Sequence, residues 1–495
     1  MPERLFAALN RVPDHRVLLS GDGRNRTAAN LRLDIEQLAG RLRQLDGKVL
    51  ALLADNGPTW ATVDLAALYA GIVLLPLPGF FNDGQLRHAL DSSATDLLLT
   101  DQTLRIAGQQ LGFREVGQWD GLSLLARDVA PLRLPTGTAK ISFTSGSTGQ
   151  PKGVCLAAAG LVDTATAVET ALTELPITRH LALLPLALLL ENVAGLYAAL
   201  LRGAEIMLPK LADLGWRGMA GFDALQLQRR TSELLPDTLI LVPELLKAWT
   251  LTLQATQLRA PDSLKFVAVG GARCDVQLLD AARGVGLPVH EGYGMTECGS
   301  VVCLDLPGGT RPGSVGRPLP QVRLSIDAEG EIHLENRAFL GYLNAPDASS
   351  ASANTHASGD LGRLDADGYL YLSGRKGNLI ITGYGRNIAP EWIESALLAQ
   401  PEIAQAMVVG EARACLAALL VAQSADADLA AAVARVNASL PDYARLGRWL
   451  SCAPFTAGNG LATGNGRPVR AAIQQRHADA IESLFTAKEP ADVVL

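Results

Sequence analysis

Apolar and polar positions alternate along the chain in blocks that predict two kinds of element. Short runs rich in Val, Ile and Leu predict strands, and longer Ala- and Leu-rich stretches such as 60–70 predict helices. The clearest strands are expected at 49–53, 96–100, 239–242 and 265–269. Because these strands alternate with helical stretches, the pattern predicts parallel sheets covered by helices, which is an α/β fold.

The pattern changes in the last third of the chain. Short alternating strands are expected at 322–326, 331–334 and 369–372, joined by turn signals rich in Asp and Gly. This texture predicts a small antiparallel, β-barrel-like subdomain at about 305–375.

A third pattern follows residue 374. Strands are expected at 404–409 and 415–421, and a closing helix at 471–485. The last 120 or so residues are long enough for a separate α+β domain.

Composition narrows the class of protein and of partner. The chain has 495 residues, of which 48% are hydrophobic and 19% charged, as in globular proteins. Its 43 Lys and Arg against 50 Asp and Glu give a net charge of −7 with no basic stripe, so a nucleic-acid partner is not expected. The 48 glycines suggest many tight turns or close approaches to a ligand.

Cysteine spacing and hydropathy predict a reduced, cytoplasmic, soluble protein. The longest apolar run, 181–190, contains Pro185 and is half the ~20 residues of a membrane-spanning helix. The N-terminus lacks the features of a secretory signal. No C-x-x-C pair is present, which favours free thiols over a metal site or disulfides. The cysteines are Cys155, Cys274, Cys298, Cys303, Cys415 and Cys452.

Residues able to bind a ligand are most concentrated in the segment ISFTSGSTGQPKGV at 141–154. Glycines expose backbone N–H groups, hydroxyls donate hydrogen bonds, and Lys152 adds a positive charge, a combination that suits a polyphosphate. The segment is not a Walker P-loop, because that pattern needs Gly-Lys followed by Ser or Thr.

This loop resembles the signature T-S-G-[ST]-T-G-x-P-K-G of the adenylate-forming superfamily, which includes acyl-CoA synthetases, peptide-synthetase adenylation domains and luciferases. The resemblance implies binding of the β- and γ-phosphates of ATP. The residues that inherit this role are Thr144, Ser145, Gly146, Ser147, Thr148, Gly149 and Lys152.

Two further segments fall in the order of that family. Residues 293–297, YGMTE, resemble its Y-G-x-T-E motif, which implies Tyr293 and Gly294 beside adenine, Thr296 on the α-phosphate and Glu297 on Mg²⁺. A hydroxyl beside a carboxylate suits such a site. Gly271 and Ala272 belong to a G-G-A segment that resembles the family's border between the acyl and nucleotide pockets.

The resemblance also implies two nucleotide-binding residues that lie apart in sequence, Asp360 and Arg375. Ser358-Gly359-Asp360 resembles the family's [ST]-G-D, whose Asp binds both ribose hydroxyls, and Arg375 lies fifteen residues later with the family spacing. A lone Asp or Arg is ordinarily a solvated surface charge, so the spacing carries the assignment.

Residues 374–394 resemble the segment that opens the family's small domain and lines its pantetheine channel. The hinge position is Gly377, which predicts a large domain at 1–376 and a small mobile domain at 377–495. Gly383, Tyr384 and Gly385 are expected at the CoA thiol after domain rotation.

One departure concerns the last catalytic position. Residues 454–463, PFTAGNGLAT, resemble long-chain acyl-CoA synthetases, as does the PLALLLEN segment at 185–192. The family then places a lysine that bridges the carboxylate and the α-phosphate, whereas this chain has Arg467. Arginine keeps the charge but is larger and planar.

The sequence therefore predicts an acid–thiol ligase of the AMP-forming acyl-CoA synthetase type. It is expected to convert a hydrophobic carboxylic acid of the fatty type, with ATP and Mg²⁺, to an acyl-adenylate and then to transfer the acyl group to CoA. The expected catalytic residues are Thr296, Glu297, Lys152 and Arg467. Two alternatives stay open. The acceptor could be the phosphopantetheine of an acyl carrier protein, or the chain could be a catalytically impaired homologue that binds nucleotide in a regulatory role.

Overall fold

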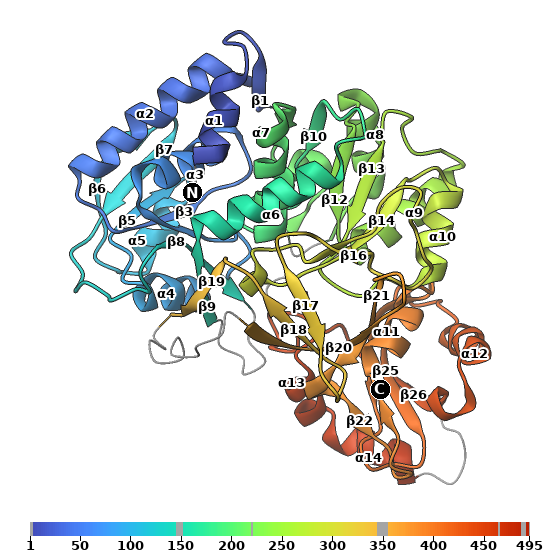
Figure 1. Cartoon of the computed structure of the whole chain (residues 1–495). Helices are drawn as coiled ribbons and strands as arrows, with labels where there is room; N and C mark the ends of the chain where they lie inside the picture. Colours follow the sequence, from blue (N-terminus) through green and yellow to red (C-terminus); the bar gives the residue numbers. More distant parts are fainter. Residues whose placement is uncertain are drawn as a thin grey trace.

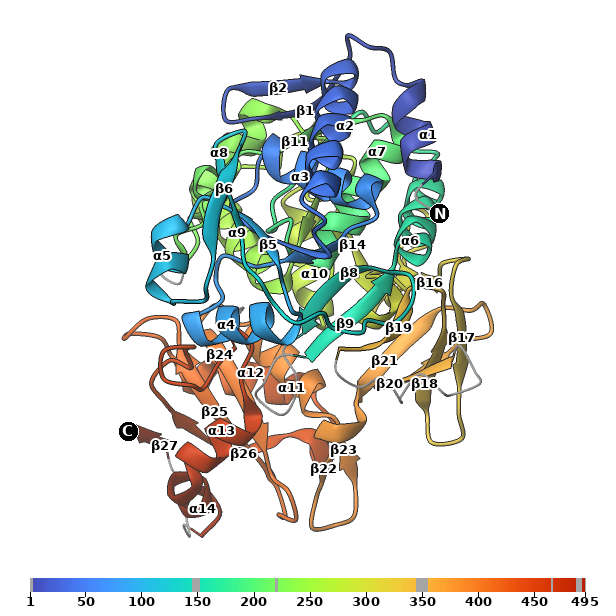
Figure 2. The same ribbon diagram turned by 90° about the vertical axis from the view of Figure 1, so that its left-hand side faces the viewer.

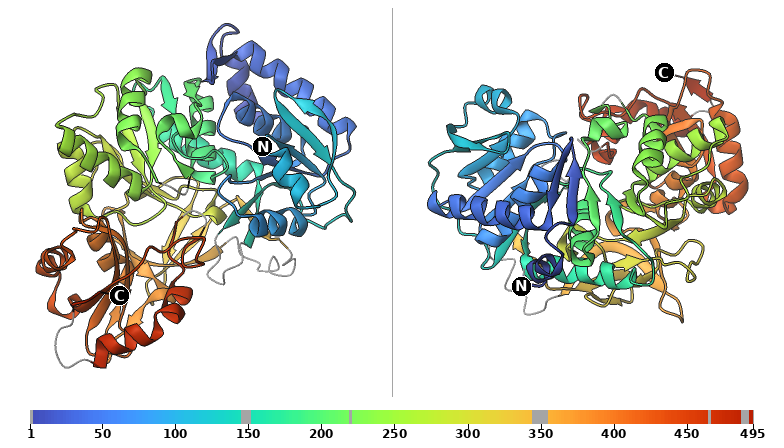
Figure 3. Two further views of the ribbon diagram at one scale, coloured as in Figure 1. Left: turned by 180° about the vertical axis from the view of Figure 1, so that it is seen from behind. Right: turned by 90° about the horizontal axis from the view of Figure 1, so that it is seen from above.

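The structure is a computed structural model that describes residues 3–144, 152–218, 221–343, 355–463, 466–486 and 492–494. Figure 1 shows a large body of sheets and helices, from blue to yellow, with the orange and red C-terminal elements at one end. The view from behind in Figure 3 shows the same separation. The α/β fold with a large N-terminal and a small C-terminal domain, predicted from the sequence, is confirmed.

The first large sheet has nine strands in the order β16-β15-β14-β13-β12-β10-β11-β1-β2. From β14 to β1 the neighbouring strands run parallel, and antiparallel strands complete both ends. The strands are β1 (Val17–Gly21), β2 (Arg24–Thr27), β10 (Arg179–Leu181), β11 (Glu205–Met207), β12 (Thr238–Leu241), β13 (Phe266–Val269), β14 (Val289–Tyr293), β15 (Cys303–Leu304) and β16 (Arg317–Pro318).

The second large sheet has eight strands in the order β19-β9-β8-β4-β3-β5-β7-β6. Its central strands β8, β4, β3 and β5 are parallel, and β8 and β9 form an antiparallel hairpin. The strands are β3 (Val49–Leu53), β4 (Val73–Pro76), β5 (Leu97–Thr100), β6 (Arg114–Trp119), β7 (Leu122–Ala126), β8 (Thr138–Thr144), β9 (Lys152–Ala157) and β19 (Phe339–Tyr342).

Local signals explain where the helices of the large domain begin and end. In α3, for example, Pro58 occupies the first turn and Gly71 ends the helix in the left-handed region, with φ of 74°. The helices are α1 (Glu3–Arg11), α2 (Ala28–Gln44), α3 (Pro58–Ala70), α4 (Asp83–Ser92), α5 (Thr103–Gly108), α6 (Ala158–Ala171), α7 (Ala198–Arg202), α8 (Ala224–Leu234), α9 (Pro243–Thr256) and α10 (Val276–Gly284), with the short helices η2 (Leu211–Leu214) and η4 (Thr296–Cys298).

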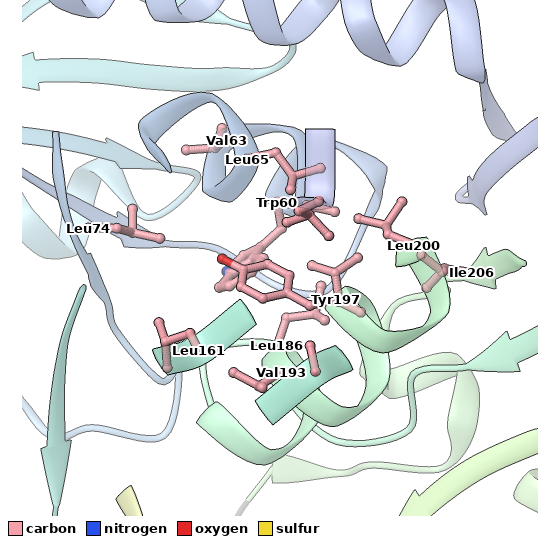
Figure 4. Close-up of a cluster of buried hydrophobic side chains, with 14 of the residues drawn as sticks. Trp60, Val63, Leu65, Leu74, Leu161, Leu186, Val193, Tyr197, Leu200 and Ile206 are labelled. Atoms are coloured by element: carbon pink, nitrogen blue, oxygen red, sulfur yellow. The ribbon is translucent and has the colours of Figure 1, made fainter. Parts of the chain in front are cut away.

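The largest apolar core joins the two sheets through α3, α6 and the π-helix η1 (Leu190–Tyr197). Figure 4 shows Trp60, Leu161, Val193 and Tyr197 packed together in this core. Trp60 and Val193, which are 133 residues apart in sequence, thereby belong to one close-packed core.

One buried ionic group lies within this layer. The Lys140 ammonium on β8 donates to Asp64 Oδ1 on α3 at 2.6 Å, to Asn192 Oδ1 and to the Tyr197 hydroxyl at 3.2 Å. Tyr197 in turn donates to Asp64 Oδ2 at 2.6 Å. Lys140 and Asp64 are 2% and 1% exposed, so this network replaces solvent for both charges.

The region expected to be barrel-like contains a four-stranded antiparallel sheet in the order β17-β18-β20-β21. Its strands are β17 (Arg323–Ile326), β18 (Glu331–Glu335), β20 (Thr355–Leu364) and β21 (Leu370–Arg375). Strand β21 leads into η6 (Lys376–Asn378) and then into the C-terminal domain. The Lys376 ammonium donates to Glu329 at 2.7 Å and to Glu331 at 2.8 Å, which fixes it to the β17–β18 hairpin.

The C-terminal domain has its own apolar clusters and a sheet in the order β24-β25-β26-β27. The closing helix expected at 471–485 is two helices, which meet at His477, whose ring packs edge-on against Phe455. The elements are β22 (Ile380–Ile381), β23 (Asn387–Ile388), α11 (Pro390–Leu398), β24 (Ile403–Val409), β25 (Leu416–Ala422), α12 (Leu429–Ser439), η7 (Asp442–Ala444), β26 (Leu446–Ser451), α13 (Arg470–Arg476), α14 (Ala478–Thr486) and β27 (Asp492–Val494).

Throughout the part of the chain that the structure describes, each helix is too short or too polar to cross a membrane. All six cysteines are free thiols, as expected from their spacing.

Candidate active site

The candidate site lies at the carboxyl ends of β13 and β14. These strands are parallel neighbours, with Val269 opposite Glu291, so the residues that follow them emerge at the same edge of the sheet. Gly271 and Ala272 follow β13, and Tyr293 ends β14. Gly271 has φ of 86°, a conformation that side chains rarely adopt. Ligands of open α/β sheets bind at this kind of edge.

Tyr293, Asp360 and Arg375 form one hydrogen-bonded group, although 82 residues of sequence separate its ends. The Tyr293 hydroxyl donates to Asp360 Oδ2 at 2.8 Å, and Arg375 Nε donates to Asp360 Oδ1 at 3.1 Å. Asp360 and Arg375 are paired across β20 and β21. Burial raises the pKa of the Asp360 carboxyl, and the charge of Arg375 opposes that rise. The structure thus brings three predicted nucleotide residues together.

A tight turn carries Thr296 and Glu297 out of β14. A Cβ atom on Gly294 would lie 1.6 Å from the carbonyl oxygen of Ser300, so only glycine fits there. Glu297 is 8% exposed, and its Oε1 accepts a hydrogen bond of 2.9 Å from the Tyr342 hydroxyl. Among the described residues no hydrogen bond engages its second oxygen, and a carboxylate oxygen is a ligand type that fits a divalent cation.

Lys152 reaches Tyr342, the partner of Glu297, from the second sheet. It begins β9 opposite Thr144, the last residue of β8, and its ammonium lies 6.0 Å from the centre of the Tyr342 ring. Tyr342 is on β19, which pairs with β9. The other loop residues, Ser145, Gly146, Ser147, Thr148 and Gly149, lie outside the described residues.

Arg467 reaches the site from the C-terminal domain. Its guanidinium donates to the carbonyl oxygen of Gly271, so the residue at the family's lysine position lies against the predicted nucleotide border. Although the Arg467 side chain is exposed, loss of hydration where its guanidinium meets the large domain lowers its pKa, and the negative charge of Glu244 opposes that shift.

Gly383, Tyr384 and Gly385 are not brought to this site. They form the tip of the β22–β23 hairpin, which Figures 1 and 2 place at the end of the C-terminal domain away from β13 and β14. Tyr384 is 76% exposed there. The domain arrangement therefore presents Arg467, and not this hairpin, to Gly271.

A cavity of about 90 Å³ adjoins the Gly271 border and is lined by both domains. Glu291 lies two residues before Tyr293 on β14, so both side chains project from the same face of the strand. Burial raises the pKa of Glu291 to about 7. The lining residues are Arg273, Cys274, Asp275, Val276, Glu291, Gly313, Val315, Leu372 and Trp392.

A buried thiol lies next in sequence to Glu297, the residue expected to bind Mg²⁺. Cys298, 1% exposed, follows Glu297 directly, and its sulfur accepts a hydrogen bond from Asn336 Nδ2 at 3.2 Å. Burial raises the pKa of the Cys298 thiol to about 12.

Comparison with known proteins settles the family. Residues 5–338 match the family described as AMP-binding enzyme, and residues 378–489 match the AMP-binding enzyme C-terminal domain. The chain belongs to the AMP-binding enzyme family.

Curated relatives of this AMP-binding enzyme are CoA ligases. It is 31% identical over 385 residues to 2-succinylbenzoate–CoA ligase of Bacillus cereus, covering 74% of this chain and 75% of the relative. It is 32% identical over 400 residues to sulfoacetate–CoA ligase of Cupriavidus necator, with 74% and 75% covered. The predicted class, an AMP-forming acid–thiol ligase, is confirmed. A solved structure of the o-succinylbenzoate CoA synthetase from Bacillus subtilis, 23% identical to this chain, is in complex with ATP and a magnesium ion. These relatives do not single out a fatty acid.

Solved structures share the fold of the AMP-binding enzyme. An o-succinylbenzoate CoA synthetase from Bacillus subtilis with its acyl-adenylate matches with a TM-score of 0.77 at 22% identity, covering 96% of this chain and 98% of that chain. An anthranilate CoA ligase with anthranoyl-AMP matches with a TM-score of 0.81 at 20% identity and the same coverage.

Sequence reasoning missed several residues of the site. Tyr342 contacts both Glu297 and Lys152 but lies in a region with no recognised chemistry. The strand period could have indicated Glu291, because it shares a face with Tyr293. Nothing local indicated Trp392, which reaches the cavity from the other domain.

Proposed function

We propose that the enzyme joins a hydrophobic carboxylic acid to ATP, releasing pyrophosphate, and passes the acyl group from the resulting acyl-adenylate to CoA. The observation that carries this proposal is the convergence of Arg467 with the Gly271 border, next to the strand that ends in Tyr293. A cation placed there suits a reaction in which negative charge builds on the α-phosphate.

Each part of the nucleotide has a partner in this proposal. Adenine would pack against Tyr293, and the ribose hydroxyls would donate to Asp360, whose carboxylate Arg375 holds in place. Lys152 and Thr144 lie where the triphosphate would extend, at the mouth of the β8–β9 hairpin. Glu297 would hold Mg²⁺, which neutralises phosphate charge when bound.

The acid would lie on the other side of the Gly270–Gly271 border. A Cβ atom on Gly270 would be 3.8 Å from Leu190 Cδ2, so the start of the π-helix faces this glycine. Leu190 is half-buried, and Leu189, the residue before it, is 7% exposed. This apolar wall supports a hydrophobic acid, fatty or aromatic, over a strongly charged one.

The test is carboxylate-dependent pyrophosphate–ATP exchange with octanoate, palmitate, benzoate and 2-succinylbenzoate. We expect exchange with at least one of these acids. Arg467→Lys should increase the rate because a compact ammonium fits between two reacting groups, and Asp360→Ala should abolish it. ATP binding without exchange for any acid would favour the impaired, regulatory homologue.

The acceptor is tested separately. Thioester formation is followed with CoA and with a phosphopantetheinylated acyl carrier protein at equal concentrations. We expect CoA to be the better substrate; a strong preference for the carrier protein would instead identify a carrier-protein ligase. We also propose a cytoplasmic location, in line with six free thiols.

A further inference from the structure

Lys247 joins the two domains at a distance from the reacting groups. It lies on α9 of the large domain, and its ammonium donates to the carbonyl oxygens of Gln400 and Ile403 at 2.6 and 2.7 Å. Both carbonyls belong to the C-terminal domain, just beyond the end of α11. More than 150 residues of sequence separate the partners.

This contact fits only one arrangement of the domains. Gln400 lies two residues beyond the end of α11 and Ile403 begins β24, and a hydrogen bond from a charged ammonium to such a backbone carbonyl is stronger than one from a neutral donor. Ala399, between α11 and these carbonyls, packs against the apolar cluster under α9. A rotation of the C-terminal domain would remove both contacts together.

The same helix also faces Arg467. Glu244, one turn before Lys247 on α9, acts electrostatically on both cations. Glu402 adds a second negative charge near Lys247 from the C-terminal side, and burial lowers the pKa of Lys247 to about 8. The first turns of α9 therefore provide a polar contact surface for the C-terminal domain in the arrangement in which Arg467 contacts Gly271.

We propose that Lys247 is a positioning residue for adenylation: its hydrogen bonds to Gln400 and Ile403 hold the C-terminal domain in the orientation that places Arg467 at Gly271. This inference rests on the proposed function, in which the acyl-adenylate forms in this orientation and thiol transfer needs another. Lys247 touches no reacting atom in this scheme.

The test separates the two half-reactions in Lys247→Met, which keeps the apolar stem and removes the donor. Pyrophosphate–ATP exchange is measured with octanoate and with 2-succinylbenzoate, and thioester formation is measured from the preformed acyl-adenylates and CoA. Loss of two charged hydrogen bonds should reduce exchange about tenfold, while transfer from the adenylate stays unchanged or becomes faster.

The matched control is Lys265→Met. Lys265 also donates to a backbone carbonyl, that of Pro176 at 2.5 Å, and pairs with Asp237 at 2.8 Å, but all three residues lie within the large domain. It should leave the ratio of the half-reactions unchanged. An equal fall of both rates in Lys247→Met, or no fall in exchange, would overturn the proposal.

A second measurement needs no substrate. Hydrogen exchange of residues 243–250 and 390–403 in the ligand-free protein should be at least about threefold faster in Lys247→Met than in the wild type. If the wild type catalyses no exchange with any of octanoate, palmitate, benzoate and 2-succinylbenzoate, the proposed function fails, and unchanged hydrogen exchange in the variant would separately refute the interdomain role.

Discussion

The buried network around Lys140 offers a direct test of how the large domain is held together. Replacing Lys140 by Met removes the ammonium and leaves the Asp64 carboxylate, 1% exposed, with the Tyr197 hydroxyl as its remaining hydrogen-bond partner. Removing one partner of a buried ion pair typically costs about 3–5 kcal/mol, because the other charge cannot be solvated. We expect Lys140→Met to destabilise the large domain by that amount.

The assay is urea-induced unfolding followed by circular dichroism, with Lys48→Met as the control. Lys48 pairs with Asp46 at 2.5 Å on the surface, with the two side chains 67% and 87% exposed, so its loss should cost less than about 1 kcal/mol.

A double variant isolates the electrostatic part. Lys140→Met combined with Asp64→Asn removes both charges but keeps a hydrogen-bond acceptor for Tyr197. We expect it to be at least about 1 kcal/mol more stable than the sum of the single variants predicts. A cost of Lys140→Met below about 1 kcal/mol, or strict additivity, would refute the reasoning.

Three further predictions concern the site and the hinge. Burial raises the pKa of Glu291 from 4.5 to about 7, so the wild type loses stability as the pH rises through that range. Glu291→Gln should therefore be more stable than the wild type by up to about 3 kcal/mol at pH 8 in thermal unfolding. This difference should vanish near pH 4.5. Gly294→Ala should lower the free energy of unfolding in urea by about 2–3 kcal/mol and abolish pyrophosphate exchange, because its Cβ atom would overlap the Ser300 carbonyl. Gly377→Ala is the control: a Cβ atom there would have nothing within 4 Å, so its free energy of unfolding should differ from that of the wild type by less than about 0.5 kcal/mol. Gly377→Pro should fix φ at the proposed hinge, reduce thioester formation at least about tenfold and change exchange less than about twofold; equal effects on both would argue against a hinge there.

Local patterns predicted the elements that local physics determines. The strands at 49–53 and 265–269 lie within one residue of their predicted bounds, because short apolar runs between turn residues have few alternatives. The helix expected at 471–485 failed at His477, where the ring packs on Phe455 and no Gly or Pro marks the break. The π-helix at 190–197 had no signal, since its apolar content suits any buried helix.

The residues of the site and of the domain contact likewise differ in whether the sequence could predict them. Tyr293, Asp360 and Arg375 could be predicted because each lies in a recognisable motif, and the structure brings them into hydrogen-bond contact. The contacts of Lys247 with Gln400 and Ile403 could not, because backbone carbonyls have no sequence signature and their position depends on domain packing.

The buried state of Cys298 has a consequence for the chemistry next to it. An acyl-adenylate is a mixed anhydride that acylates thiolates, and a thiolate one residue from Glu297 would compete with CoA for the acyl group. Only the deprotonated form attacks, and with the pKa at about 12 the thiolate fraction at pH 7 is on the order of one in 10⁵. Burial also raises the pKa of Cys274 in the neighbouring cavity. In the proposed reaction, these two thiols would therefore stay protonated and would not compete with CoA for the acyl group.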